Sequence, residues 1–365
     1  MKNTIGNSIS VTLFGESHGV AIGAVIDGLA PGITIDKDYI NNKLALRRPA
    51  GKISTARREE DEVKILSGVF NNKTTGTPIC IVIENQDVQS KDYDKVSGVA
   101  RPGHADFAAF TKYHGFEDYR GGGHFSGRIT AALVAAGSIL QYALEQKGII
   151  IGTHIKECAC IKDAEFSDID KDIKLLNSLE FAVIDDLVKA KMIKAIEDAA
   201  KDNDSVGGIL ETAVLGMPEG VGEPWFDTVE SILAHALFSI PAFKGVEFGK
   251  GFEISKMRGS EANDTFFIEN GSIKTKTNNN GGINGGITNG MPIVFRCAVK
   301  PTPSIGIEQD TVDFKNNLEV KTTINGRHDP AIIHRARVVV DSVTAICLAD
   351  QLALRFGTDY LRTDK

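Results

Sequence analysis

Short apolar runs separated by polar and glycine-rich turns recur along the chain. Runs of this length and composition are typical of strands that are buried on one or both faces. They predict strands at residues 8–14, 20–26, 63–70, 78–84, 148–160, 207–217 and 291–299. A single turn at residues 71–76 is expected to join the third and fourth of these strands.

Apolar residues at helical spacing mark a second kind of segment. Residues 36–46 also carry acidic residues in their first turn, as helices often do. Further helices are expected at residues 107–114, 129–146 and 228–238, and residues 331–356 predict a helix or a strand followed by a helix. Strands and helices do not alternate as in a doubly wound sheet, so the pattern alone predicts an α/β mixture with three or four buried helices.

Residues 163–204 differ from the rest of the chain. They are rich in charge, helical in period and free of the Gly, His and Arg motifs found elsewhere. We expect a peripheral helical insertion without a catalytic role, inside a single domain that spans residues 1–365.

Composition narrows the function classes. Of 365 residues, 42% are hydrophobic and 24% are charged, which suits a protein with a sizeable core. The net charge of −7 argues against general nucleic-acid binding, so any cationic site must be local. Residues 1–10 lack the layout of a signal peptide, and no apolar run approaches the length of a membrane span. A cytoplasmic protein without a membrane partner is therefore expected.

Five scattered cysteines, an odd number, contain no C-x-x-C pair and argue against a disulfide framework or a zinc ribbon. Cys158 and Cys160 lie in a strand-like run and are expected to be buried packing residues.

Three consecutive glycines dominate the segment Arg120–Arg128. Without Cβ atoms, their N–H groups can converge on an anion. Ser126 then lies near the start of an apolar helix, where the positive end of the helix dipole favours phosphate or carboxylate. A tight turn before a buried helix is the alternative.

Two histidines stand in glycine-containing turns. His18 lies between Gly15 and Gly19, and His104 follows Pro102 and Gly103 at the start of a predicted helix. Histidine serves as a general acid or base near neutral pH. The alternatives are a hydrogen-bonded turn histidine at position 18 and, at position 104, a structural turn capped by Asp106. The histidine spacing does not fit a zinc site.

Basic residues cluster in an otherwise acidic protein. Arg47, Arg48, Lys52, Arg57 and Arg58 fall within about a dozen positions, before an acidic block at residues 59–62. Arginine side chains suit a bidentate grip on phosphate or carboxylate. A solvated charged surface is the usual explanation of such a run. Binding of a small acidic ligand is the more specific alternative.

The second half adds three motifs. A second glycine-rich loop covers residues 278–287, and residues 300–304 read Lys-Pro-Thr-Pro-Ser at the end of a predicted strand. Residues 326–330 read Gly-Arg-His-Asp-Pro before the C-terminal apolar segment.

Taken in order, these motifs resemble those of the chorismate synthase family over essentially the whole chain. They are Gly-Glu-Ser-His-Gly, Arg-Pro-Gly-His-Ala-Asp, the triple glycine, Gly-Gly-Ile-Asn-Gly-Gly-Ile, Lys-Pro-Thr-Pro-Ser and Gly-Arg-His-Asp-Pro. The resemblance implies the last step of the shikimate pathway, in which 5-enolpyruvylshikimate 3-phosphate loses phosphate and a ring proton in an anti 1,4-elimination. It further implies an α+β fold, a β-α-β sandwich of antiparallel sheets around central helices, assembled as a homotetramer.

The resemblance also assigns roles to residues. His18 would protonate the reduced flavin, His104 would protonate the departing phosphate, and Asp329 would help the flavin accept the substrate proton, supported by Ser17 and Ser126. Reduced FMN would contact His124, Phe125, Ser126, Pro241, Ala242, Gly285, Lys300, Pro301, Thr302, Pro303, Ser304 and Arg327. The acidic groups of the substrate would bind Arg47, Arg48, Lys52, Arg101, Arg128 and Arg335. No metal is implied.

This sequence departs from the commoner family pattern at several positions. His124-Phe125-Ser126-Gly127-Arg128 stands where Arg-Ser-Ser-Ala-Arg is usual, which removes one cation and one hydroxyl. The basic loop is one residue shorter, Lys52 replaces an arginine, Pro241 replaces an asparagine, and Pro303 replaces a serine.

Two other functions stay open on the residues alone. A phosphatase or phosphoryl-transfer enzyme could use Arg327, His328 and Asp329 on a phosphate without flavin, and a flavin- or nucleotide-binding regulatory protein would show no turnover. No G-x-G-x-x-G follows a predicted strand, so NADPH is expected to act only indirectly, through an external flavin reductase.

Overall fold

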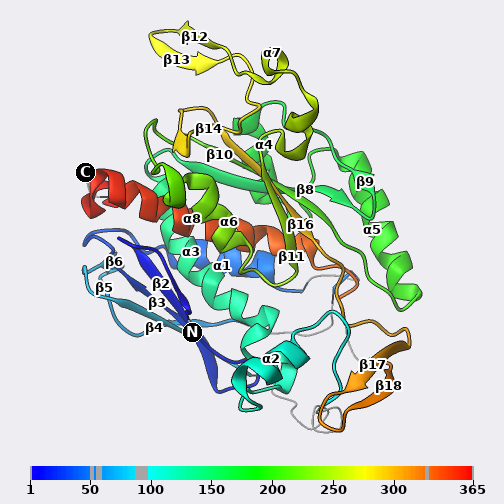
Figure 1. Ribbon diagram of the computed structural model, residues 1–365. Coiled ribbons are helices and arrows are strands. Elements are labelled where there is room, and N and C mark those ends of the chain that lie inside the picture. Colours follow the sequence, from blue (N-terminus) through cyan, green and yellow to red (C-terminus); the bar gives the residue numbers. More distant parts are fainter. Residues whose placement is uncertain (1, 50–52, 55–59, 87–97, 325–328, 364–365) are drawn as a thin grey trace.

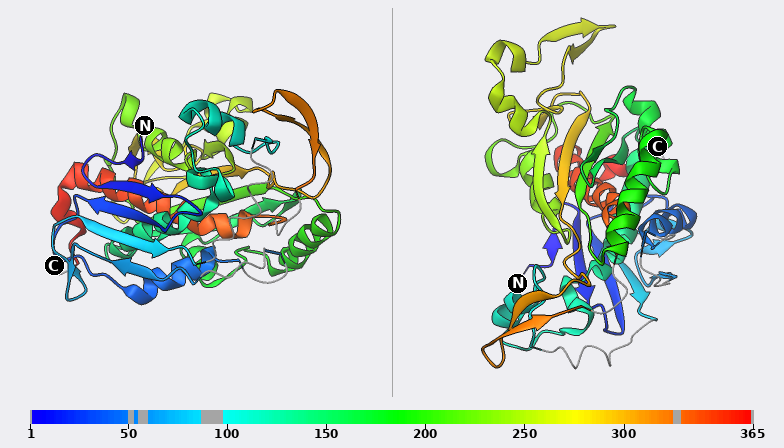
Figure 2. Two further views of the ribbon diagram at one scale, coloured as in Figure 1. Left: turned by 90° about the horizontal axis from the view of Figure 1, so that it is seen from below. Right: turned by 90° about the vertical axis from the view of Figure 1, so that its right-hand side faces the viewer.

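Two five-stranded antiparallel sheets enclose a layer of helices (Figures 1 and 2). The computed structural model describes residues 2–49, 53–54, 60–86, 98–324 and 329–363. The first sheet has the order β1-β2-β3-β7-β4, with bounds Thr4–Ile5, Ser10–Gly15, Ala21–Asp27, Ile79–Glu84 and Val63–Ile65. The second has the order β11-β16-β10-β8-β9, with bounds Phe243–Phe248, Ile293–Val299, Gly208–Leu215, Ile150–Cys158 and Ile161–Lys162.

Alternating β-branched residues give the first sheet its buried face. Val11 of β2 pairs with Ile26 of β3, and Ile26 pairs with Ile79 of β7. All three side chains are buried in the common core. Side chains that face one another across neighbouring strands pack together, and this row fixes the register of the sheet.

Helices α3 (Thr130–Glu145) and α8 (Ile333–Phe356) form the centre of the middle layer, with α1 (Lys37–Arg47) and α6 (Val229–Leu237) beside them. Helix α3 packs on the first sheet and α8 on the second. A Cβ atom at Gly137 of α3 would lie 2.4 Å from Cβ of Ser342 in α8, so glycine permits this close approach. The predicted sandwich of antiparallel sheets around central helices is confirmed.

Helix α8 is buried over almost its whole length, which explains why its sequence shows no clear polar face. It even buries charge: Asp341 accepts a hydrogen bond of 2.6 Å from Thr153 Oγ1 of β8. Burial raises the pKa of Asp341, while Lys43 and Arg337 oppose the rise.

Residues 163–204 form α4 (Ile169–Ser178) and α5 (Asp186–Lys201). Because Thr153 faces α8, the neighbouring Gly152 faces the opposite side of the second sheet, and Ile173 of α4 packs against it. This segment therefore covers part of the outer face of that sheet (Figure 1). Its lack of a catalytic role stays a prediction.

The remaining elements are short. Apart from short 3₁₀ helices, those in the described residues are α2 (Asp106–Tyr113), α7 (Gly259–Ala262) and four two-stranded hairpins: β5 (Val69–Phe70) with β6 (Lys73–Thr74), β12 (Phe266–Glu269) with β13 (Ser272–Thr275), β14 (Ile283–Asn284) with β15 (Ile287–Thr288), and β17 (Gln309–Asp313) with β18 (Leu318–Thr322). The β12–β13 hairpin projects from one end of the molecule (Figure 1).

Three sequence predictions need correction. Residues 63–70 are not one strand, because β4 ends at Ile65 and β5 turns back into β6 through Asn71 and Asn72, both with positive φ. Cys158 is buried as expected, whereas Cys160 is exposed in the turn after β8. Within the described residues, Gly127–Glu145 does have the length and composition of a membrane span, but 89% of that apolar window is buried inside the protein.

Candidate active site

The triple-glycine turn brings the two predicted catalytic histidines together. Gly121, Gly122 and Gly123 have φ values of 58°, 84° and 53°. A Cβ atom at Gly121 would lie 2.4 Å from His18 Nε2, and one at Gly122 would lie 3.2 Å from His104 Cε1. Glycine is required here both by backbone conformation and by space, because the two imidazoles lie against adjacent residues of one turn.

His18 lies in the loop that follows β2, and its exposure is only 4%. Two groups hold this loop. Ser17 N donates to Gly123 O at 3.1 Å, and Asn85 Nδ2 donates to Glu16 O at 3.0 Å and to Gly19 O at 2.9 Å. The backbone on both sides of His18 is therefore fixed from the glycine turn and from the end of β7.

His104 is held by Asp106, which also binds Arg101. His104 Nδ1 lies 2.7 Å from Asp106 Oδ1, and Arg101 donates to both carboxylate oxygens of Asp106, at 2.7 and 2.8 Å. Burial favours a higher pKa for Asp106, but Arg101 and His104 outweigh burial and hold that pKa below its ordinary value. Asp106 is not the N-cap residue of α2, which is Ala105, but its Oδ2 accepts from Arg101 N at 2.9 Å and so closes the turn that contains His104.

A cavity of about 880 Å³ opens beside this turn. Its inner wall is apolar and includes Leu133 of α3 and Val343 and Ile346 of α8. The predicted cofactor residues that line it are His124, Phe125, Ser126, Pro241, Ala242, Lys300, Thr302, Pro303 and Ser304, and His104 and Asp329 line it as well. Burial, together with Lys244 in the same wall, lowers the pKa of Lys300.

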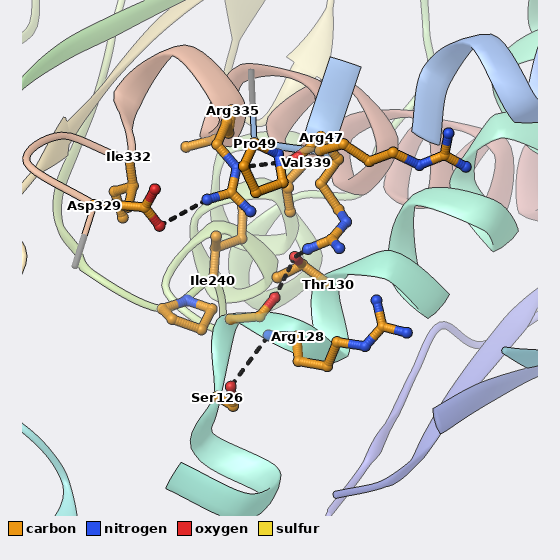
Figure 3. Close-up of a pocket in the computed structure, with 14 residues that line it drawn as sticks. Arg47, Pro49, Ser126, Arg128, Thr130, Ile240, Asp329, Ile332, Arg335 and Val339 are labelled. Carbon is orange, nitrogen blue, oxygen red and sulfur yellow. Dashed lines mark hydrogen bonds and ion pairs between the residues drawn. The ribbon is translucent and has the colours of Figure 1, made fainter. Parts of the chain in front are cut away.

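A smaller cavity of about 230 Å³ adjoins the larger one (Figure 3). Four predicted substrate cations line it: Arg47, Arg48, Arg128 and Arg335. The two cavities share part of their walls, namely Ser126, Gly127, Thr130, Ile240, Pro241, Asp329 and Ile332. Any ligand in the arginine-lined cavity would thus adjoin one in the larger cavity.

Two carboxylates order these arginines. Arg335 donates from Nη1 to Asp329 Oδ2 at 2.7 Å and from Nε to the Arg47 carbonyl at 2.7 Å (Figure 3). Asp61 accepts from Arg47 Nη2 at 3.0 Å and from Arg128 Nη1. Burial lowers the pKa of Arg47, and the negative charge of Asp61 opposes that shift. Because Arg47 in turn lowers the pKa of Asp61, each side chain stabilises the charged form of the other.

Five predicted residues are described by the structure but line neither cavity: Ser17, His18, Arg101, Pro301 and Gly285. The first three adjoin the site through the contacts above. Gly285 lies in the turn between β14 and β15. Lys52 and Arg327 fall outside the described residues. Among the residues that are described, no group of three His, Cys, Asp or Glu could hold a metal ion.

Sequence reasoning missed several partners of the site. Asp61 belongs to the acidic block at residues 59–62, to which no role in the site was assigned, and Asn85 follows β7 without belonging to any motif. Lys244 belongs to none of the sequence motifs, yet it lines the larger cavity. The positive φ of Ala242, 75°, is a further mark of a constrained site that only coordinates reveal.

Known proteins resemble this chain over nearly its full length. The chorismate synthase family profile matches residues 9–353. The chain is 48% identical over 359 residues to a chorismate synthase of Dehalococcoides mccartyi, covering 98% of each chain. It is 46% identical over 350 residues to a chorismate synthase of Pyrococcus abyssi, covering 96% of this chain and 97% of the other. The chain belongs to the chorismate synthase family.

A solved chorismate synthase crystal structure agrees with this conclusion. It superposes with a TM-score of 0.76 at 28% identity, over 97% of this chain and 94% of the other. The enzyme is accordingly a carbon–oxygen lyase of the final step of the shikimate pathway, and the chorismate synthase fold accounts for the layered sheets and central helices described above.

Proposed function

We propose that this chain converts 5-enolpyruvylshikimate 3-phosphate into chorismate by anti 1,4-elimination of phosphate and a ring proton, with reduced FMN in the larger cavity. The observation that carries the proposal is the wall shared by an arginine-lined cavity and a larger, partly apolar one. Both adjoin the turn against which His18 and His104 lie.

The smaller cavity suits the acidic groups of the substrate, a phosphate and two carboxylates. Four guanidiniums line it, and two carboxylates, Asp61 and Asp329, contact them within the described part of the chain. Within the described residues, the four guanidinium groups therefore outnumber the two carboxylates. In a partly buried site such charges act strongly on a bound anion.

The larger cavity fits a flavin mononucleotide. Its volume of about 880 Å³ and its apolar inner wall suit an isoalloxazine ring, and the ammonium groups of Lys244 and Lys300 suit a phosphate. When bound, reduced FMN supplies electrons transiently and a basic nitrogen to an elimination without net redox change. His124, Phe125, Ser126, Pro241, Ala242 and residues 300–304 would hold it, with Arg327 and the more distant Gly285 as further assigned contacts.

The substitutions at positions 124 and 125 leave the backbone contacts of the turn in place. His124 Nδ1 donates to Gly15 O at 2.7 Å, so this side chain ties the turn to β2. The Phe125 ring packs edge-on against Tyr113, with ring centroids 6.0 Å apart, and its other surface lines the larger cavity. Phe125 would therefore replace a polar contact with an apolar one.

The acid–base roles follow from these positions. His104, oriented by Asp106 in the cavity wall, would donate a proton to the departing phosphate. His18, which lies against Gly121, would carry the proton that protonates the reduced flavin. Asp329, held in place by Arg335, would assist removal of the ring proton from the substrate. Ser17 and Ser126 would support them; the Ser126 hydroxyl already accepts from Arg128 N at 3.3 Å.

Assembly and supply of reductant complete the proposal. A homotetramer would cover exposed aromatic side chains such as Trp225, Phe226 and Phe252, each more than four-fifths exposed. The enzyme would work in the cytoplasm, apart from nucleic acid and membrane, and would receive reduced FMN from an external NADPH-dependent flavin reductase.

Substitution of each histidine tests the proposal. His18→Ala and His104→Ala should each lower kcat by about a hundredfold or more, while the Kd for the substrate changes by less than about threefold, because general acids act on the transition state. His114→Asn, at an exposed histidine that lines neither cavity, is the control and should leave kcat unchanged. An unchanged kcat in both variants would contradict the acid–base roles proposed for the two histidines.

A further inference from the structure

The arginine-lined cavity and the His18 loop are linked by an unbroken set of hydrogen bonds. It begins at Asp61, whose side chain is fully buried. One oxygen accepts from Arg47 Nη2 at 3.0 Å and the other from Arg128 Nη1. Arg48 Nε lies 3.9 Å from the first oxygen. One carboxylate thus contacts three of the four arginines in the cavity wall.

The backbone at Asp61 shows that this position is constrained. Its φ is 51°, a conformation that residues other than glycine seldom adopt. Burial favours a higher pKa for Asp61, but Arg47 and Arg128 outweigh burial, and the pKa lies below its ordinary value. Asp61 therefore remains a carboxylate at working pH and keeps its hold on both guanidiniums.

Arg128 carries the link onward. Its Nε donates to Asn85 Oδ1 at 3.0 Å, while its Nη1 donates to Asp61. The amide nitrogen of Asn85 then donates to Glu16 O and Gly19 O, which bracket Ser17 and His18. Asn85 thus contacts both Arg128 of the arginine-lined cavity and the loop of His18.

We infer that Asp61 and Asn85 are positioning residues: Asp61 fixes the guanidiniums that take the anionic substrate, and Asn85 fixes the His18 loop in register with them. The inference rests on the proposed function, since it assumes that the arginines bind substrate and that His18 acts in turnover. Asp61 acts on binding, and Asn85 acts on the chemical step.

The two sites of action predict opposite kinetic signatures. Asp61→Asn should raise the KM and the Kd for 5-enolpyruvylshikimate 3-phosphate by about tenfold or more and lower kcat by less than about threefold, because a hydrogen bond to a charged group contributes about one tenfold step in affinity. Asn85→Ala should lower kcat by about tenfold, because both hydrogen bonds to the His18 loop are lost.

Asn85→Asp tests the acceptor and the donor function of the Asn85 amide separately. It keeps an acceptor for Arg128 Nε but removes the donor to Glu16 O and Gly19 O. We expect its Kd for substrate to stay within about threefold of wild type while kcat falls about tenfold, as in Asn85→Ala. Glu84→Gln, which removes an exposed carboxylate on the neighbouring residue, is the matched control and should leave both constants unchanged.

The experiment measures KM and kcat with reduced FMN, the Kd for the substrate by calorimetry, and thermal unfolding for each variant. Equal changes of KM and kcat in the Asn85 variants, or wild-type kcat in both, would overturn the inference. Should Asp61→Asn not fold, the two Asn85 variants decide it alone. Failure of wild type to bind or convert the substrate would instead contradict the proposed function, so the two failures are distinct.

Discussion

Gly121 lies directly against the His18 imidazole: a Cβ atom at position 121 would fall 2.3 Å from His18 Cδ2 and 2.4 Å from Nε2. The ring belongs to the loop after β2, which Ser17 N and Asn85 hold in place. The imidazole therefore has little freedom to retreat, and the geometry of His18 depends on the absence of a side chain at one position of the turn.

Gly121→Ala should therefore damage catalysis more than stability. We expect kcat to fall about a hundredfold, because a displacement of about 1 Å at a reacting group costs that much. The φ of 58° adds only about 1–2 kcal/mol of strain. Steady-state kinetics and thermal unfolding check this. Gly259→Ala, where a Cβ would meet nothing within 4 Å, is the control, and equal kcat in both variants would refute the expectation.

Gly137→Ala tests the packing of α3 on α8. Helix propensity alone predicts stabilisation by about 1 kcal/mol. However, a Cβ at position 137 would lie 2.7 Å from Ser342 Cα, and backbone cannot yield as the end of a side chain can. Overpacking costs about 1–3 kcal/mol, so we expect net destabilisation in urea unfolding. A variant more stable than wild type would contradict this expectation and would show that α3 and α8 can move apart at little cost to accommodate the added methyl group.

His154 gives stability a pH dependence. It is fully buried between Asp163 Oδ2, at 2.7 Å, and Glu211 Oε2, at 3.0 Å. Burial favours a lower pKa for His154, but the two carboxylates outweigh burial and raise that pKa. Lys156 and Arg296 also face Glu211, at 3.2 and 3.6 Å, and the Phe166 ring packs against the imidazole.

Because the folded pKa of His154 is raised, its contribution is complete below its unfolded pKa, near pH 6.5, and is lost as the pH rises through the folded value. His154→Gln should thus lower the free energy of unfolding by about 3 kcal/mol at about pH 6 and by less at about pH 9. Exposed His235→Gln serves as the control in the same denaturant titrations. If the free energy of unfolding lost in His154→Gln instead grew with pH, the result would contradict a raised pKa for His154.

Much of the fold was predictable because local patterns matched the tertiary environment. Strand β3 and strand β7 were found from short apolar runs, and α3 was found from helical spacing. The division of residues 63–70 was not, because two asparagines at positive φ start a hairpin that the apolar residues do not signal. The layering itself came from family resemblance, since periodicity does not say which faces of two sheets meet the same helices.

The site shows the same division. Motifs identified His18, His104 and the basic residues as chemical candidates, but residues far apart in sequence decide how they act. Asp61 looked like part of a solvated acidic block, yet it is buried against Arg47 and Arg128. Asn85 carries no motif at all. Such partners become visible only when coordinates show what each side chain faces.

An anaerobic assay with 5-enolpyruvylshikimate 3-phosphate tests the central claim most directly. Phosphate release and appearance of the diene product are followed together, with dithionite-reduced FMN, with oxidised FMN and without flavin. The account predicts one phosphate per diene formed, only in the presence of reduced FMN, because the elimination depends on electrons that the cavity residues do not supply. Phosphate release from the substrate without reduced FMN would contradict it and would indicate a phosphatase.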